Sequence, residues 1–247
     1  MARSKIRLYV DQPLGVGQSI ELESKQAHYL FSVMRLKEQA SVRVFNGRDG
    51  EFLAEVVRVA KRGGLLVVTE RSRPFEPLPD VMLIFAPIKK GRTDFLVEKA
   101  VELGAGILQP VQTDFTNSER IRADKMHLHV IEAAEQCEAV ALPEIRPLGK
   151  LRDVIETLSG TRKIAFCDEA ADAGFQGESG ASDAAWAILI GPEGGFSEQE
   201  RAWLLARPEV VRISLGPRIL RAETAALAAL TLWQAQIGDW DKKGGLI

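Results

Sequence analysis

The sequence predicts an α/β protein in two parts: a small β-barrel over residues 1–73 and a larger domain over residues 74–247 with a parallel sheet. Short stretches in which apolar and polar residues alternate fill the first part, as in strands with one buried face. Continuous apolar runs that alternate with helical patterns fill the second part, as in a parallel sheet covered on both faces. Residues 71–80 include three prolines and fit an extended linker between the parts.

The clearest signal in the first part is a hairpin. Residues 42–44 and 52–56 alternate in polarity on either side of the turn-rich sequence NGRDG. Further strands are predicted at IRLYV (6–10), SIEL (19–22) and LLVVTE (65–70). A helix capped by Ser24 is predicted between them, with its buried face made by Ala27, Leu30, Phe31 and Met34.

The second part alternates strands with helices. Strands are predicted at VMLIFA (81–86), ILQPV (107–111), KIAFC (163–167), AWAILI (185–190) and VVRISL (210–215). Helices are predicted over residues 92–103, 124–139, 151–158 and 222–237, with another that begins at Ser197. In the first of these helices Phe95, Leu96, Val101 and Leu103 are expected to face inward, and Gly104 to end it. Residues 172–183 are rich in Gly, Ser and Ala and are predicted to form a loop.

Composition indicates a globular protein without a membrane span. Hydrophobic residues make up 46% and charged residues 27%. No apolar run reaches the roughly 18 residues that a spanning helix needs, and no apolar segment follows the basic N-terminal residues as in a secretory signal. Cys137 and Cys167 stand apart from any CxxC or Cys/His cluster and are expected to be structural thiols of a reducing compartment. We therefore predict a cytoplasmic location.

The charge is unevenly distributed. The net charge is −2, but residues 1–75 contain 13 Lys and Arg against 8 Asp and Glu, whereas residues 76–247 contain 19 against 26. A basic module on an otherwise neutral chain suits a polyanionic partner such as RNA. A solvated basic surface without a partner would give the same pattern.

Three predicted strands end in sequences typical of a ligand site. KIAFC is followed by Asp168, AWAILI by GPEGG, and VVRISL by GPRILR. Ligands of open α/β sheets bind beyond the carboxyl ends of the strands, so these loops are expected to converge. Glycines let backbone approach a ligand, although they also serve plain tight turns. The predicted ligand-binding residues are Cys167, Asp168, Glu169, Ile190, Gly191, Pro192, Gly194, Gly195, Leu215, Gly216, Ile219, Leu220, Thr224 and Ala225.

The chemistry of these loops favours S-adenosylmethionine over a nucleotide phosphate. A GxGxxG turn after the first strand and a GxxxxGK[ST] loop are both lacking. The one charge in GPEGG is acidic, which suits a ribose diol, an ammonium and a sulfonium. Ile219 and Leu220 are apolar where a surface loop is usually polar, and they can wall an adenine.

Arg221 stands out because it precedes the last predicted helix. The helix dipole disfavours a cation there, so an anionic partner is expected. Either an RNA group or a nearby carboxylate, Glu193 or Glu223, fits that description.

These motifs resemble a known family. IGPEGGFSEQE and LGPRILRAETA resemble the SPOUT-class RNA methyltransferases, in particular the RsmE-type enzymes that methylate N3 of a uridine in 16S ribosomal RNA. HYLFSVMRLK (28–37), FNGRDGEF (45–52), KKGRTDFLVEKAVELG (89–104) and AAEQCEAV (133–140) extend the resemblance over nearly the whole chain. One departure is Glu138-Ala139, where the family usually has Gly-Arg. If that arginine contacts RNA, this chain must supply the contact differently.

The resemblance implies a PUA-like barrel for RNA and a C-terminal domain with a trefoil knot that binds S-adenosylmethionine. It also implies a homodimer whose RNA site is completed across subunits. The expected partner is 16S ribosomal RNA or the small subunit, and no metal is required. The RNA-binding candidates are the basic residues Arg3, Arg7, Arg35, Arg43, Arg48, Lys89, Lys90 and Arg92.

In this interpretation Arg221 is the catalytic residue that stabilises the anion formed when uridine N3 loses its proton. Glu193, Glu223 and water are candidate bases. His127 and His129 are two residues apart on a predicted helix and do not share a face, so they are not expected to bind a metal. Three alternatives remain: methylation of a ribose 2′-hydroxyl or another base, a non-catalytic RNA-binding assembly protein, and a nucleotide-dependent oxidoreductase.

Overall fold

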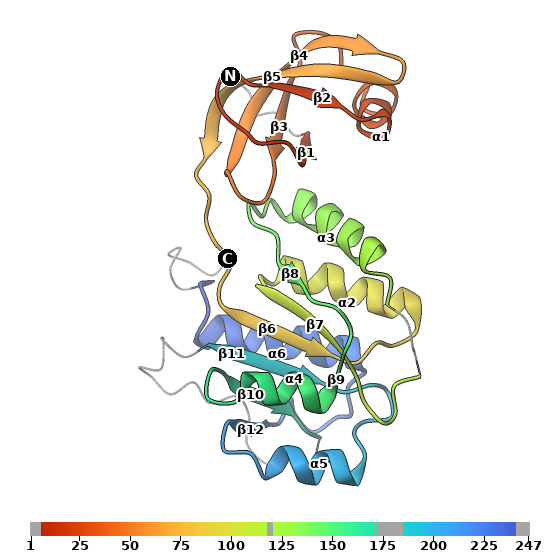
Figure 1. The fold of residues 1–247 in the computed structure, drawn as a ribbon, viewed down its shortest axis with the longest axis vertical. Helices are drawn as coiled ribbons and strands as arrows, with labels where there is room; N and C mark the ends of the chain where they lie inside the picture. The colour runs from red at the N-terminus through yellow and green to blue at the C-terminus, as the bar shows by residue number, and fades with distance from the viewer. Residues whose placement is uncertain (1–5, 118–120, 170, 172–184, 241–247) are drawn as a thin grey trace. The chain divides into compact units, whose positions relative to one another are not determined.

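The computed structural model describes residues 6–117, 121–169, 171 and 185–240 (Figure 1). The chain forms two compact units, Met1–Pro77 with Ala134–Leu142 and Leu78–Ala133 with Pro143–Ile247. The first unit therefore contains a short segment from the middle of the chain that the sequence does not assign to it. Arg3 and the predicted loop at 172–183 lie outside the described residues.

The first unit is built on a five-stranded sheet in the order β1-β3-β4-β5-β2. Its strands are β1 (Arg7–Tyr9), β2 (Ser19–Leu22), β3 (Ser41–Phe45), β4 (Glu51–Ala60) and β5 (Gly63–Arg73). The predicted hairpin is confirmed: β3 and β4 are antiparallel, with Val42 opposite Ala54 and Val44 opposite Phe52. These four side chains are buried in the core of the unit, as the period of two requires.

The predicted helix of this unit is partly wrong. It begins with α1 (Ser24–Ala27) and continues as the π-helical segment η1 (His28–Val33). Its N-cap is Glu23, which forms a capping box with Gln26, rather than Ser24. Ala27 and Leu30 are buried as expected, but Met34 is 40% exposed because the wider π-helical turn rotates it out of the apolar face.

The predicted linker begins later than expected. Residues 71–73 belong to β5, which pairs with β4 as far as Glu51 opposite Arg73. Pairing with β4 keeps residues 71–73 in the strand, although the prolines that follow predict a linker there. The extended segment without strand pairing starts at Pro74.

The second unit contains a seven-stranded parallel sheet in the order β12-β10-β11-β6-β7-β8, with β9 also paired to β7. Its strands are β6 (Val81–Phe85), β7 (Ile107–Gln112), β8 (Glu144–Ile145), β9 (Gly149–Lys150), β10 (Lys163–Cys167), β11 (Trp186–Ile190) and β12 (Val210–Ile213). The five predicted strands are all present. The two-residue strands β8 and β9 are too short for a periodic signal.

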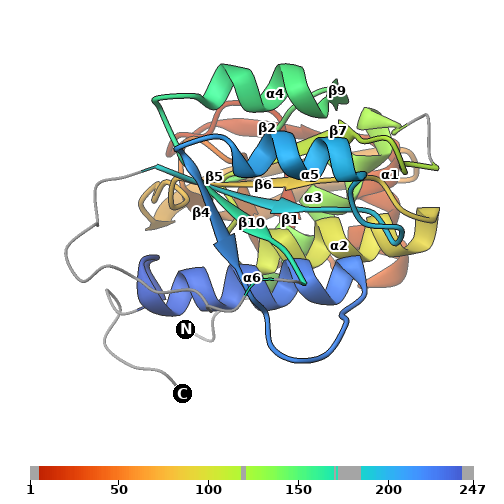
Figure 2. The same cartoon turned by 90° about the horizontal axis from the view of Figure 1, so that it is seen from below.

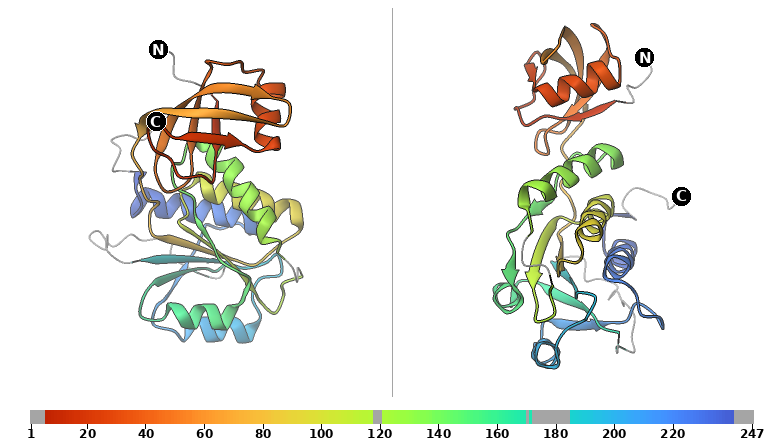
Figure 3. Two further views of the ribbon diagram at one scale, coloured as in Figure 1. Left: turned by 45° about the horizontal axis from the view of Figure 1, so that its top comes forward. Right: turned by 90° about the vertical axis from the view of Figure 1, so that its right-hand side faces the viewer.

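Helices cover both faces of this sheet (Figures 2 and 3). Helices α2 (Lys90–Glu102) and α6 (Ala222–Gln236) lie on one face, and α4 (Leu151–Leu158) and α5 (Glu198–Leu205) on the other (Figure 3); α3 (Ala123–Cys137) runs from the second unit into the segment Ala134–Leu142 of the first. Met82 and Ile84 of β6 pack with Ile155 of α4 and Leu204 of α5. Helices α2 and α6 pack on each other, and α6 contacts β11. Because both faces are buried, every residue of β6 and β11 is buried, which explains their continuous apolar runs.

The inward face of α2 differs from the prediction at one position. Leu96 and Val101 are buried, but Phe95 is 41% exposed. The buried face of α2 is made by Leu96, Val97, Ala100 and Val101, and position 95 is about 200° from position 97, so Phe95 points away from that face. Gly104 has a φ of +75° and follows the last turn of α2, as predicted.

Helix α6 and the other helices of the described residues are too short or too polar to span a membrane. The trefoil knot that the family resemblance implies stays a prediction.

Candidate functional site

The carboxyl ends of three adjacent strands, β12, β10 and β11, open onto a cavity of about 550 Å³ in the second unit. The loops after all three strands line it. All the predicted ligand-binding residues except Thr224 lie in its wall, and so does Arg221. Thr224 is exposed on the first turn of α6. The predicted convergence of the loops is therefore correct.

The wall also contains residues that were not predicted to bind the ligand: Arg92, Phe166, Glu193, Phe196, Arg201, Ile213, Arg218 and Ala222. Phe166 and Phe196 meet edge to face, with ring centroids 5.2 Å apart. Phe196 directly follows GPEGG in the sequence. Its ring points into the cavity wall because of the path of the loop, which the sequence motif does not specify.

The glycine loop is shaped by this aromatic pair. A Cβ atom at Gly191 would lie 2.6 Å from the ring of Phe196, far inside van der Waals contact. Gly195 has a φ of +69°, a backbone conformation that favours glycine. Gly191 therefore makes room for a side chain, and Gly195 makes the turn.

We expect Gly191→Ala to weaken S-adenosylmethionine binding at least tenfold, because the added methyl group must displace Phe196 or the loop backbone. Isothermal titration calorimetry measures the affinity. Gly15→Ala is the control, since Gly15 lies in the first unit, does not line the cavity, and has only Gln18 Oε1 near its Cβ position, at an ordinary contact distance of 3.8 Å. Equal affinity for the wild-type protein and Gly191→Ala would contradict this account of the loop.

Two arginines fix the end of β10. Asp168 is 7% exposed, and its Oδ2 accepts hydrogen bonds from Arg201 Nη2 at 2.9 Å and Arg212 Nε at 3.0 Å. A carboxylate held in this way orients the loop backbone at the cavity. Glu169, the next residue, is exposed and lines the cavity, so its carboxylate, unlike that of Asp168, is available to a ligand.

The two cysteines differ in their environment. Cys167 is partly exposed in the cavity wall, and desolvation raises the pKa of its thiol to about 12, whereas Cys137 is exposed. Because the thiolate is the reactive form, we expect iodoacetamide at pH 8 to modify Cys137 and to leave Cys167 unmodified in the folded protein. Peptide mass spectrometry locates the adduct, and modification of both residues in denaturant is the control. Rapid modification of Cys167 in the folded protein would show that this end of β10 opens.

Helix α5 begins at Ser197 with the predicted capping box. Ser197 Oγ accepts from Glu200 N at 3.2 Å, and Glu200 Oε2 accepts from Ser197 N at 3.0 Å. The box also holds the turn after β7, because Asp114 N donates to Glu200 Oε1 at 2.9 Å. Glu200 is buried, so this junction between the two loops is fixed.

Arg92, predicted to bind RNA, instead pairs with the two carboxylates that were considered as partners of Arg221. Its guanidinium bonds Glu193, and its Nε lies 3.6 Å from Glu223 Oε1. Arg92 thereby joins the first turn of α2 to the glycine loop and to the start of α6. Arg221 is the exposed N-cap of α6, and within the described part of the chain its side chain makes no ion pair.

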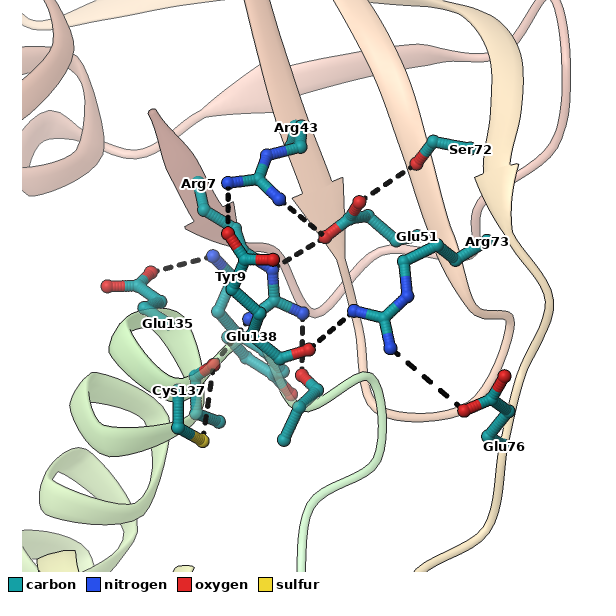
Figure 4. A network of polar contacts seen from close by, with 12 residues as sticks. Arg7, Tyr9, Arg43, Glu51, Ser72, Arg73, Glu76, Glu135, Cys137 and Glu138 are labelled. Atoms are coloured by element: carbon teal, nitrogen blue, oxygen red, sulfur yellow. Dashed lines mark hydrogen bonds and ion pairs between the residues drawn. The ribbon is translucent and has the colours of Figure 1, made fainter. Parts of the chain in front are cut away.

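Two further predicted RNA contacts, Arg7 and Arg43, have a structural role (Figure 4). Both are buried around Glu51, which is 1% exposed: Arg7 Nε lies 2.7 Å and Arg43 Nη1 3.8 Å from its Oε2. Arg7 also donates to the carbonyls of Ala134 and Ala139, and its guanidinium stacks on the ring of Phe45. We therefore infer that these two arginines stabilise the fold of the first unit rather than bind RNA.

The departure from the family pattern, Glu138-Ala139, belongs to the same network. Glu138 has a φ of +62°, in the left-handed region where glycine is favoured, which explains the usual glycine. Its carboxylate accepts from Arg43 Nη2 and its carbonyl from Arg73 Nη1, both at 2.7 Å. The bond from Arg43 holds the pKa of this carboxyl below its ordinary value.

The remaining RNA candidates fall into two groups. Arg35 is exposed with a φ of +56°, and Arg48 is half-exposed and pairs with Asp11. Lys89 is the exposed N-cap of α2 in the second unit, and Lys90 begins that helix, although its side chain lies outside the described part. His129 lies within 4 Å of Asp94, Glu98 and Glu132, but no group of side chains among the described residues has the arrangement of a metal site.

Comparison with known proteins agrees with this architecture. A family model described as an RNA methyltransferase domain matches residues 76–234, and one described as an RNA methyltransferase PUA domain matches residues 22–69. The protein named ribosomal RNA small subunit methyltransferase E from Rickettsia conorii is 31% identical over 91% of this chain and 93% of its own length. The protein of the same name from Buchnera aphidicola (Schizaphis graminum) is 30% identical over 94% of this chain and 97% of its own length.

Two solved structures share the whole fold. The enzyme of that name from Neisseria gonorrhoeae, bound to S-adenosyl methionine, has a TM-score of 0.84 at 26% identity and covers 95% of this chain and 99% of its own. A putative methyltransferase from Legionella pneumophila, with the same cofactor bound, has a TM-score of 0.83 at 29% identity over 95% and 98%.

The fold, the cavity at the strand ends and the matching family model define an RNA methyltransferase with an N-terminal PUA domain. Within that class, the chain belongs to the ribosomal RNA small subunit methyltransferase E family. It is a ribosomal RNA methyltransferase.

Proposed function

We propose that the protein transfers the methyl group of S-adenosylmethionine to N3 of one uridine in the 16S RNA of the small ribosomal subunit. The observation that carries this proposal is the glycine-lined cavity beyond β10, β11 and β12, in a chain of the methyltransferase E family. The choice of uridine N3 rests on the family resemblance of the motifs.

The cavity suits S-adenosylmethionine in size and chemistry. About 550 Å³ lies in the range of small-molecule sites. Glu169 is the carboxylate for the ribose diol, the glycines at 191, 194 and 195 let the backbone approach, and Ile219 and Leu220 provide apolar surface for the adenine. Ile219 is 85% exposed, which suits a residue that gains its contacts from a ligand. When bound there, the cofactor supplies an activated methyl group.

The residues of the cavity then have to activate the uridine. N3 is a good nucleophile only after its proton leaves, and the negative charge spreads to the two adjacent carbonyl oxygens. Arg221 lies at the cavity with its guanidinium exposed, and it donates hydrogen bonds to one of those oxygens. Of the two carboxylates that pair with Arg92, Glu193 lines the cavity and Glu223 does not, so Glu193 is the candidate acceptor of the N3 proton.

We assign RNA contact outside the cavity to Arg35 and Arg48 of the PUA domain and to Lys89 and Lys90 at the start of α2. Phosphate contacts of this kind make binding weaken as salt rises. The resemblance further supports a homodimer, a knotted second unit and a cytoplasmic location.

Two measurements test the function. Calorimetry with S-adenosylmethionine tests cofactor binding, and nucleoside mass spectrometry of unmethylated small subunits treated with the protein identifies the product. We expect binding and one 3-methyluridine per subunit. A protein that binds no cofactor would end the methyltransferase assignment, and a 2′-O-methylated nucleoside would move the target to the ribose.

A further inference from the structure

The turn after β7 carries an exposed phenylalanine next to the glycine loop. Phe115 is 46% exposed. A Cβ atom at Gly194 would lie 3.4 Å from Phe115 Cβ and 3.8 Å from its ring carbons Cγ and Cδ2. Since Gly194 lines the cavity, the phenyl side chain lies against the outer side of the cavity wall.

This turn is held by its own hydrogen bonds. Thr113 N donates to Thr116 Oγ1 at 2.9 Å, and Thr116 N donates to Thr113 O at 3.1 Å. The two hydroxyl oxygens are 2.8 Å apart and share a hydrogen bond. Phe115 therefore stands at the tip of a closed turn.

The turn is also attached to α5. Ser197 Oγ donates to Asp114 Oδ2 at 2.5 Å, and Asp114 N donates to the buried Glu200 at 2.9 Å. With the residues on either side of it bonded, Phe115 has no freedom to fold into the core. A single exposed apolar side chain is ordinary, but one fixed beside a ligand cavity is placed to meet a ligand.

Polar groups belong to the glycine loop against which the ring packs. Glu193, the residue before Gly194, pairs with Arg92. The guanidinium and the carboxylate line the cavity, and the flat apolar face of Phe115 lies against the outer side of the same glycine loop. The edge of uracil presents an N–H donor between two carbonyl acceptors, and its faces are flat, so the base matches this set of groups.

We propose that Phe115 is a specificity-determining residue whose ring stacks on the target pyrimidine and holds N3 at the mouth of the cavity. This inference rests on the proposed function and deepens it. Stacking on one aromatic ring is a frequent way to hold an unpaired base, and it tolerates replacement by another aromatic ring.

The test compares Phe115→Ala, Phe115→Leu and Phe115→Tyr on small subunits at saturating S-adenosylmethionine. We expect kcat/KM to fall about ten- to hundredfold for alanine and leucine and to stay near the wild-type value for tyrosine, as the loss of one stacked base predicts. Cofactor affinity by calorimetry is expected to be unchanged in all three. The conservative tyrosine separates stacking from a packing role, because leucine preserves apolar contact without the flat ring.

Phe95→Ala is the matched control, since Phe95 is similarly exposed on α2 but, unlike Phe115, is not among the residues nearest to the Cβ positions of the glycine loop. We expect full activity for it. Full activity of Phe115→Ala, or an equal loss in Phe95→Ala, overturns the stacking role, and so does weakened cofactor binding in Phe115→Ala. If the wild-type protein neither binds S-adenosylmethionine nor methylates RNA, the proposed function itself fails.

Discussion

Replacement of Arg221 by alanine is expected to lower the methylation rate about 10²- to 10³-fold, the usual cost of removing a donor that stabilises a developing anion. S-adenosylmethionine affinity is expected to stay near the wild-type value. The reason is structural: Arg221 is the exposed N-cap of α6, and Arg92 pairs with the carboxylates that would otherwise neutralise it. Single-turnover methylation of small subunits measures the rate.

A pH series distinguishes anion stabilisation from a structural role. As the pH rises from 7 to 9, more uridine loses its N3 proton without help from the protein. The residual rate of Arg221→Ala should therefore rise more steeply with pH than the wild-type rate. If the substitution instead lowered the rate by disturbing the fold, the residual rate would not rise more steeply with pH than the wild-type rate.

Arg152→Ala is the charge-matched control, because Arg152 is exposed on α4 and does not line the cavity. It should retain full activity. A wild-type methylation rate for Arg221→Ala would remove this residue from the mechanism. Arg92 or Arg218, which also line the cavity, would then be the candidates to stabilise the anion.

The position of the site could be predicted from the sequence because the strands and turns that form it have local sequence patterns. Strands β10 and β11 are short apolar runs, and parallel strands that neighbour each other bring their carboxyl ends together. The start of α5 followed for the same reason, since Ser197 and Glu200 are three residues apart. Neither inference needed a contact between distant segments.

The contacts of the arginines could not be predicted in that way. Arg92 is 101 residues from Glu193, and Arg7 is 44 from Glu51, so no local spacing joins them. A cation in a basic segment looks like a surface residue until the fold supplies a buried carboxylate. The crowding of Gly191 by Phe196 likewise depends on a ring direction that the glycine motif does not specify.

Glu138 shows how a departure from a motif can be compensated. The left-handed backbone there disfavours glutamate, but glycine has no carboxylate to offer Arg43. The sequence shows only the exchange, whereas the structure shows the ion pair that accompanies it.

Replacement of Glu51 by glutamine is expected to destabilise the PUA domain by about 3–5 kcal/mol, the range for breaking a buried ion pair by removal of one partner. Glu51 is 1% exposed and bonds Arg7 and Ser72, with Arg43 also within 4 Å. Glutamine keeps the shape but removes the charge, so the buried Arg7 loses the carboxylate with which it pairs, and Arg43 loses one of its two, Glu138 being the other. Arginine does not escape this cost by losing its proton.

Chemical denaturation followed by circular dichroism measures the loss, with the two units treated as separate transitions where they separate. Glu55→Gln removes the same charge from an exposed position of the same strand, β4, and should change stability by less than about 0.5 kcal/mol. Because the cavity lies in the second unit, cofactor affinity should survive in Glu51→Gln at temperatures where the PUA domain has unfolded. Equal stability of the two glutamine variants would show that the buried arginines do not depend on Glu51.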